Sequence, residues 1–111
     1  MAVGETTLLQ KTVTLSATAT QYRGVLLTGA AVSAAGNGYP CATGGVSGDS
    51  VPVVLMGVAI CEAGAAITAG ALLEFDSAGR YITRSSGAIV GRALSTAAGS
   101  GSLFEGFVIP N

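Results

Sequence analysis

Short apolar runs recur along the whole chain, and clusters of Gly, Ser, Asn and Asp separate them. Runs rich in Val, Ile and Leu at this spacing are typical of an all-β protein, in which each run forms a strand and each polar cluster a turn. The pattern offers no clear place for a helix. It predicts eight strands, near Leu8–Leu15, Arg23–Thr28, Tyr39–Ala42, Val51–Cys61, Leu72–Phe75, Tyr81–Arg84, Ile89–Leu94 and Phe104–Ile109.

Two of the predicted strands differ in how many of their faces are apolar. In the first, Leu9, Val13 and Leu15 share one face and threonines occupy the other, which predicts a half-buried strand. In Val53–Cys61 both sets of alternate residues are apolar. A strand of that kind is expected to be covered on both faces, so it is our candidate for the centre of the core or of a subunit contact.

The clearest local signal is a turn between the strands at 72–75 and 81–84. Asp76 can accept hydrogen bonds from its own turn, and Gly79 can adopt a positive φ without a steric penalty. The sequence therefore predicts a β-hairpin here. Glu74 and Asp76 share one strand face, a pattern that also suits acid–base chemistry, but alternation with buried neighbours predicts that both carboxylates lie on the solvent side.

The chain length of 111 residues fits one domain. Residues 1–7 lack periodicity and are expected to form a flexible N-terminal arm, and residues 8–111 to form a single β domain. Stretches at 33–38, 44–49 and 95–101 are rich in Gly, Ala and Ser and are expected to be loops. The predicted fold class is therefore all-β, a small single-domain β-barrel or β-sandwich.

The composition and charge of the chain exclude several classes of protein and of binding partner. The chain is 50% hydrophobic with a formal net charge of -1, which excludes disorder over most of its length. Five Lys and Arg against six Asp and Glu exclude the basic excess that nucleic-acid and membrane-surface binding require. No apolar segment is long enough to span a membrane, and no secretory signal is evident at the start. A mean hydropathy of +0.63 with few charges predicts that identical copies or a larger assembly cover part of the surface.

The residues that most enzymes use are scarce. The chain has no His, which removes the Ser/His/Asp and Cys/His nucleophile systems, and Lys11 lacks the spacing of a Ser/Lys pair. The glycine-rich stretches do not match a phosphate-binding loop. Cys41 and Cys61 cannot complete a metal site, and they are expected to be buried thiols, with a disulfide left open. We therefore expect no enzyme, no cofactor and no metal.

Three arginines, at 80, 84 and 92, could form a small cationic patch for a partner that carries carboxylates. Ordinary surface pairing with nearby acids is the alternative. Residues of the arm could in turn pair with a strand edge of a partner, with a simple frayed end as the alternative. The candidate partner-binding residues are Glu5, Thr6, Thr7, Arg80, Arg84 and Arg92.

About half of the chain, from Val51 onward, carries an ordered series of glycine turns and strands. The series is Gly57-Val-Ala-Ile, Ala63-Gly-Ala-Ala-Ile67-Thr-Ala-Gly70-Ala-Leu-Leu, Asp76-Ser-Ala-Gly79-Arg-Tyr-Ile-Thr, Ile89-Val-Gly91-Arg-Ala93-Leu and a last strand ending near Ile109. In this order the segments resemble the capsid cement, or head decoration, proteins of tailed bacteriophages.

The resemblance implies a compact β protein that assembles as a homotrimer on the exterior of an icosahedral head, where it binds the major capsid protein and stabilises contacts between capsid subunits. It implies no catalytic residue. Location on the virion and synthesis in the host cytoplasm follow as expectations. The alternative is a β module of another phage or bacterial assembly, such as a tail, fibre or adhesin component, and a small hydrolase or sugar-binding protein is a third class.

Overall fold

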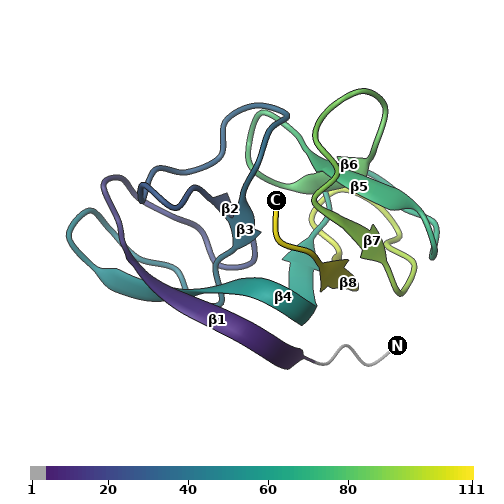
Figure 1. Ribbon diagram of the computed structural model, residues 1–111. Coiled ribbons are helices and arrows are strands. Elements are labelled where there is room, and N and C mark those ends of the chain that lie inside the picture. The colour runs from purple at the N-terminus through teal and green to yellow at the C-terminus, as the bar shows by residue number, and fades with distance from the viewer. Residues whose placement is uncertain (1–4) are drawn as a thin grey trace.

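The computed structural model describes residues 5–111, which form eight β-strands and no helix (Figure 1). None of these residues forms a helix that is long and apolar enough to cross a membrane. The strands are β1 (Thr6–Thr14), β2 (Gly24–Val25), β3 (Tyr39–Pro40), β4 (Ser50–Glu62), β5 (Leu72–Phe75), β6 (Tyr81–Thr83), β7 (Gly91–Ala93) and β8 (Leu103–Val108).

Six of the strands form one antiparallel sheet in the order β1-β4-β8-β7-β5-β6, and β2 and β3 form a small second sheet. The all-β prediction is confirmed. Because β1 and β6 lie at the two edges of the large sheet, this sheet is not closed into a barrel. The long strand β4 is second in this order and pairs with β1 on one side and β8 on the other, so it links the edge strand β1 to the rest of the sheet.

The eight strands lie where the sequence pattern predicts them, with shifts of one to three residues at most ends. The largest consequence is at the start of β1, which begins at Thr6 rather than Leu8. Thr6 and Thr7, which the sequence assigns to the arm, pair with Val58 and Gly57 of β4. The first strand therefore starts two residues before the predicted Leu8, because β4 is long enough to offer Thr6 and Thr7 a backbone partner. Residues 1–4 of the expected arm lie outside the described residues.

Strand β1 is an edge strand with two features that break its regularity. Its register against β4 shifts between Thr7 and Leu9 and again between Leu9 and Gln10. Leu8 and Leu9 are 66% and 51% exposed beside this irregularity, and Lys11 is exposed further along the strand. β1 therefore presents a bulged edge that carries a charge.

The core lies on the inner face of the large sheet. The rings of Phe75, Tyr81 and Phe104 are almost completely buried there. The ring centroids of Phe75 and Tyr81 are 4.6 Å apart, and Tyr81 meets Phe104 edge-on at 6.0 Å. Aromatic pairs in these arrangements stabilise a core beyond their buried area.

The small sheet packs closely against this aromatic cluster. A Cβ atom built on Gly24 of β2 would lie 2.5 Å from Cε1 of Phe75 and 2.7 Å from its Cζ, well inside normal contact distance. The backbone N–H of Gly24 also donates to the carbonyl of Gly79, at 2.8 Å. Glycine at position 24 is therefore required by the close approach of the two sheets.

The predicted hairpin between β5 and β6 is confirmed. Asp76 Oδ1 accepts hydrogen bonds from the backbone N–H groups of Ala78 and Arg80, at 2.8 and 2.9 Å. Gly79 has φ +75°, and its N–H donates to the carbonyl of Asp76 at 3.1 Å. The positive φ explains why this turn contains glycine.

Both cysteines are free and buried. Burial raises the pKa of the Cys61 thiol to about 12, and the pKa of Cys41 is also raised, mainly by burial. The thiol of Cys41 donates a hydrogen bond to the carbonyl of Thr43. The two cysteines therefore serve as small buried side chains, as the sequence predicts.

Candidate functional site

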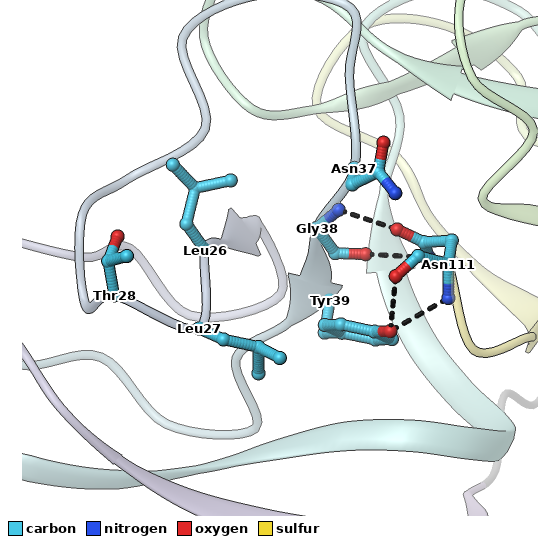
Figure 2. Close-up of a pocket in the computed structure, with 7 residues that line it drawn as sticks. All are labelled: Leu26, Leu27, Thr28, Asn37, Gly38, Tyr39 and Asn111. Carbon is cyan, nitrogen blue, oxygen red and sulfur yellow. Dashed lines mark hydrogen bonds between the residues drawn. The ribbon is translucent and has the colours of Figure 1, made fainter.

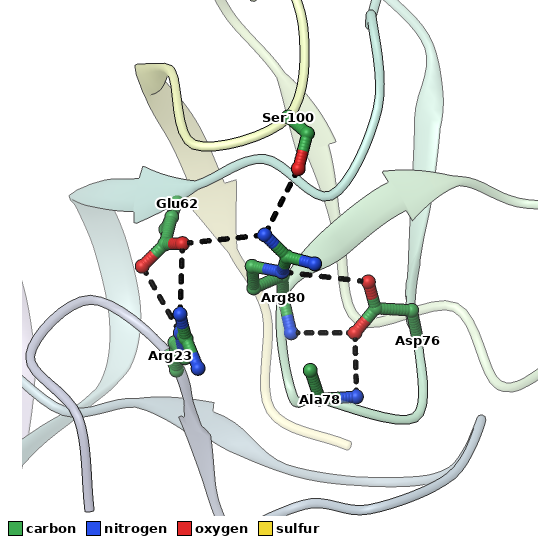
Figure 3. Close-up of polar contacts among 6 residues, drawn as sticks. All are labelled: Arg23, Glu62, Asp76, Ala78, Arg80 and Ser100. Carbon is green, nitrogen blue, oxygen red and sulfur yellow. Dashed lines mark hydrogen bonds and ion pairs between the residues drawn. The ribbon is translucent and has the colours of Figure 1, made fainter.

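Arg80 takes part in a partly exposed polar network (Figure 3). Its guanidinium donates to Ser100 Oγ at 2.9 Å and lies 3.8 Å from carboxylate oxygens of both Glu62 and Asp76. On the other side of Glu62, Arg23 donates two hydrogen bonds to the carboxylate, at 3.0 and 3.1 Å. The network therefore ties β2 and the β5–β6 hairpin to the end of β4.

The Arg23–Glu62 pair is the strongest contact in this network, because a planar guanidinium meets a carboxylate through two bonds. The side chain of Glu62 is 14% exposed, and its hydrogen bonds raise the pKa of Arg23 above its ordinary value. Arg80 already has acidic neighbours within the chain, so the structure separates it from the other two arginines of the expected patch.

Arg84 and Arg92 are both exposed and differ from Arg80 in their contacts. Arg84 Nε donates to the carbonyl of Gly87 at 2.9 Å, and Arg92 Nη1 donates to the carbonyl of Gly70 at 2.7 Å. The ion pairs of residues 5–111 involve neither arginine. Each backbone contact occupies one of the five N–H donors of a guanidinium and leaves others for a partner.

The register of the large sheet aligns these two arginines in one row across all six strands. Residues that pair directly on neighbouring strands point to the same face of a sheet. The backbone N–H of Arg84, just after β6, donates to the carbonyl of Leu72 at 2.8 Å, which places these two residues side by side. The strand pairing gives the other neighbours in the row. From β6 to β1 the row is Arg84, Leu72, Arg92, Phe107, Val58 and Thr6. We call it the arginine row.

The arginine row lies on the outward face of the sheet. Its members alternate along their strands with residues that are buried in the core, such as Leu73, Ala93 and Val108. Two members of the row, Val58 and Phe107, are half-buried. Around the row on the same face, Ile60 is half-buried, and Met56, Leu94 and Leu103 are 36%, 48% and 44% exposed.

Within one chain, the cover expected over both faces of Val53–Cys61 is only partial. Val53, Ala59 and Cys61 face the core, and Val54 is also buried. Further along the strand the second face is only partly covered within the chain, because Met56 is exposed and Val58 half-buried. The doubly apolar pattern therefore marks a strand with one face in the core and one face that contributes to an apolar surface.

The expectation that Glu74 lies in solvent is wrong. Glu74 is 6% exposed, and its Oε1 accepts backbone N–H bonds from Ser85, Ser86 and Gly87, at 2.6, 3.1 and 3.0 Å. These hydrogen bonds and the charge of Arg84 lower the pKa of the carboxyl below its ordinary value of 4.5. The side chain points away from the core, as its alternation predicts, but the loop after β6 folds over it.

Glu5, Thr6 and Thr7, the candidate residues of the expected arm, do not lie together on one surface. Glu5 is exposed ahead of β1, and its carboxylate accepts a long hydrogen bond from the Thr7 hydroxyl, at 3.5 Å. Thr6 is exposed at the end of the arginine row, whereas Thr7 is half-buried on the opposite face of β1. Of the six candidates, the structure brings Thr6, Arg84 and Arg92 into one row and leaves Glu5, Thr7 and Arg80 outside it.

A pocket of about 250 Å³ lies beside β3 (Figure 2). It is lined by Leu26, Leu27, Thr28, Asn37, Gly38, Tyr39 and Asn111. The side chain of Asn111 bonds both backbone groups of Gly38, and the Tyr39 hydroxyl bonds the backbone N–H and carbonyl of Asn111. These hydrogen bonds hold Asn111 against Gly38 and Tyr39, so these polar groups at the pocket already have partners within the chain.

The described residues contain no group of three or more His, Cys, Asp and Glu side chains that could hold a metal ion. What the outward face can do chemically is bind a surface: apolar side chains supply contact area, and two arginines supply directed donors. Sequence reasoning identified the arginines but missed Leu72, Leu94 and Phe107. Only the strand register reveals that they share a face, although the doubly apolar pattern of β4 was a partial signal.

Comparisons with known proteins agree with a structural role. Compared by sequence with curated proteins, the chain has no match. Its fold is similar to the N base of head fiber gp8.5 in bacteriophage phi29, with a TM-score of 0.60 and 17% identity, over 90% of this chain and 92% of that one. A family model described as phage cement protein matches residues 3–108. The chain therefore belongs to the phage cement protein family and is a structural protein that decorates the phage capsid.

Proposed function

We propose that this protein attaches to the outside of an assembled phage head as a homotrimer and stabilises the contacts between major capsid subunits. The observation that supports binding through the body of the protein is the outward face, where Met56, Leu94 and Leu103 are each more than one-third exposed. Surfaces of this kind on soluble proteins are typical of interaction sites. The number of three subunits depends on the resemblance to decoration proteins.

In this proposal the body is a small β-sandwich, in which β2 and β3 pack on the inner face of the large sheet. It is made in the host cytoplasm and acts without a catalytic step or a cofactor. A protein that binds only the assembled shell stabilises it by mass action, because free capsid subunits offer no complete site. Three linked copies then turn weak individual contacts into strong attachment.

The N-terminal residues are proposed to add to this attachment. Glu5, Thr6 and Thr7 would contact the capsid along the open edge of β1, with Thr6 at the end of the arginine row. Deleting residues 1–7 should leave the oligomeric state unchanged and weaken attachment, since one lost contact is repeated in each subunit. Equal binding by the full-length and the shortened protein would show that attachment depends on the β body alone.

The test of the main proposal is co-sedimentation of the purified protein with capsids of its own phage that were assembled without it. Tails from the same phage and buffer alone serve as controls. We expect the protein to pellet with capsids only, and light scattering to give the mass of a trimer. Binding to tails but not to capsids would refute the capsid role, and a monomer across micromolar concentrations would refute the trimer.

The likeness to a head fiber base supports a second candidate, a part of another phage or bacterial assembly such as a tail, fibre or adhesin component. In that case the chain would anchor a longer structure rather than reinforce the shell. The temperature at which capsids open, measured with and without the bound protein, separates the two, because a reinforcing protein raises this temperature and an anchor alone leaves it unchanged.

A further inference from the structure

The two halves of the chain repeat one pattern of backbone pairing. In the first half, residues that pair across strands are Val13 with Val51, Ala19 with Gly45, Gly24 with Pro40 and Cys41 with Val53. In the second half, the corresponding pairs are Cys61 with Phe104, Ile67 with Ala97, Leu72 with Arg92 and Ala93 with Gly106. Cys61 lies 48 residues after Val13, and Gly106 lies 53 residues after Val53. The pattern therefore recurs in the same order, with a few more residues in the second half.

The turns between these pairs also repeat. In four turns the N–H of the fourth residue donates to the carbonyl of the first, and each turn leads directly into a strand: Thr20–Arg23, Val46–Asp49, Thr68–Ala71 and Gly99–Ser102. The third residues are Tyr22, Gly48, Gly70 and Gly101, with φ between +70° and +96°. The N–H of Tyr22 donates to the carbonyl of Cys41 at 2.8 Å, and the N–H of Gly70 donates to that of Ala93 at 2.7 Å. Tyr22 therefore has a positive φ at a position where the other three turns have glycine.

The buried positions correspond as well, although the side chains differ. Val13, Leu15 and Ala19 are buried in the first half, and so are their counterparts Cys61, Ala63 and Ile67 in the second. Between residues 13–25 and 61–73, only the positions of Ala17 and Thr20 have the same residue in both halves. The repeat is therefore visible in the pairing of the backbone and not in the letters of the sequence.

We propose that residues 13–53 and 61–106 are two copies of one structural unit, and that β4 joins them by ending the first unit and beginning the second. Turn preferences explain why a turn recurs, but the recurring pairs join residues that are far apart in the chain. The units differ where they meet, because the ring of Phe75 in the second unit covers Gly24 in the first, whereas Leu72, the counterpart of Gly24, is half-buried. This inference does not depend on the proposed function.

One part of the core shows the two units filling the same space from different positions. The first unit has the large Leu15 and the small Ala19, whereas the second has the small Ala63 and the large Ile67. Gly45 pairs with Ala19, and a Cβ built on Gly45 would lie 3.0 Å from Cδ1 of Leu15, so the three residues border one space. If the two units share one backbone, the two sizes can be exchanged, because a swap that conserves volume is tolerated best in a core.

The test exchanges these sizes in the first unit and follows thermal unfolding by circular dichroism at one protein concentration. Leu15→Ala alone should lower the melting temperature by on the order of 10 °C, because it leaves a cavity. Adding Ala19→Ile should recover about half of this loss or more, since the new side chain takes the place that Ile67 has in the second unit. The control adds Ala17→Ile to Leu15→Ala, which places the same side chain at an exposed position of the same turn region and should recover nothing.

The second unit supplies the reciprocal test. Ile67→Ala should lower the melting temperature, and adding Ala63→Leu should recover part of the loss. Failure to recover in the first unit or in the second would overturn the proposal, because copies of one unit must accept each other's packing. Equal recovery by Ala17→Ile and Ala19→Ile would also overturn it, because added hydrophobicity would then explain the effect. If Leu15→Ala does not fold, we expect the exchange with Ala19→Ile to restore a folded protein, and an unfolded double variant would overturn the proposal.

Discussion

The contact between Gly24 and the ring of Phe75 predicts a specific coupling between the two sheets. In Gly24→Ala, the new Cβ would lie 2.5 and 2.7 Å from two ring atoms and 2.9 Å from Cγ2 of Val32, so the ring would have to retreat by about 1 Å to reach normal contact. Phe75 is 0% exposed and lies against Tyr81, and a tightly packed interior leaves little space for such a shift.

The expected cost combines two opposing effects. Overpacking of this kind costs about 1–3 kcal/mol, and the lower entropy of alanine in the unfolded chain offsets about 0.4–1 kcal/mol of it. We therefore expect Gly24→Ala to reduce the free energy of unfolding by roughly 1–2 kcal/mol. Phe75→Leu removes the two ring atoms that clash and leaves only the contact with Val32, so Gly24→Ala should cost less in that background.

The assay is a double-mutant cycle measured by denaturant unfolding with circular dichroism, with all four proteins at one concentration because an oligomer's stability depends on it. Gly99→Ala is the control, since its Cβ would meet no atom within 4 Å and should leave stability almost unchanged. The expected coupling between Gly24→Ala and Phe75→Leu is about 1 kcal/mol. Equal costs of Gly24→Ala in both backgrounds would refute the close packing of the sheets on this ring.

Two further predictions concern the β5–β6 region. Gly79→Val should lower stability by about 1 kcal/mol or more, because φ +75° is unfavourable for a β-branched residue and the new Cβ would lie 2.9 Å from the carbonyl oxygen of Val32; an unchanged melting temperature would contradict this. The lowered pKa of Glu74 stabilises the fold above its ordinary value of 4.5, and this contribution is lost as the pH falls through the lower folded value. Between about pH 6 and pH 3, the melting temperature should therefore fall further for the wild type than for Glu74→Gln, and parallel curves would contradict the linkage.

Local patterns in this sequence were enough to predict the strands and the hairpin. Leu72–Phe75 forms β5 as expected, and the roles of Asp76 and Gly79 in the turn were correct, because turn chemistry depends on residues that are neighbours in the chain. The start of β1 was placed too late because pairing with Val58 depends on the length of β4, which a threonine-rich segment does not reveal.

The candidate site was predictable only in part. Arg84 and Arg92 stood out as charges, but their alignment with Phe107 depends on the spatial order β8-β7-β5-β6, which differs from the order of these strands in the sequence. Arg80 also stood out in the sequence as a charge, but it has a different role, because the hairpin brings it close to Glu62. Glu74 was misjudged because alternation gives the direction of a side chain but not what a later loop places over it.

The irregular edge of β1 has a consequence for a protein that accumulates in many copies on one particle. A long, flat edge strand can template pairing with the edge of the next molecule, and repeated pairing leads to fibres instead of single particles. The register shifts around Leu9 interrupt the row of backbone donors and acceptors, and Lys11 places a charge that a pairing strand would have to accommodate. The bulged, charged edge therefore works against uncontrolled polymerisation in solution, which keeps the molecules available to bind the shell.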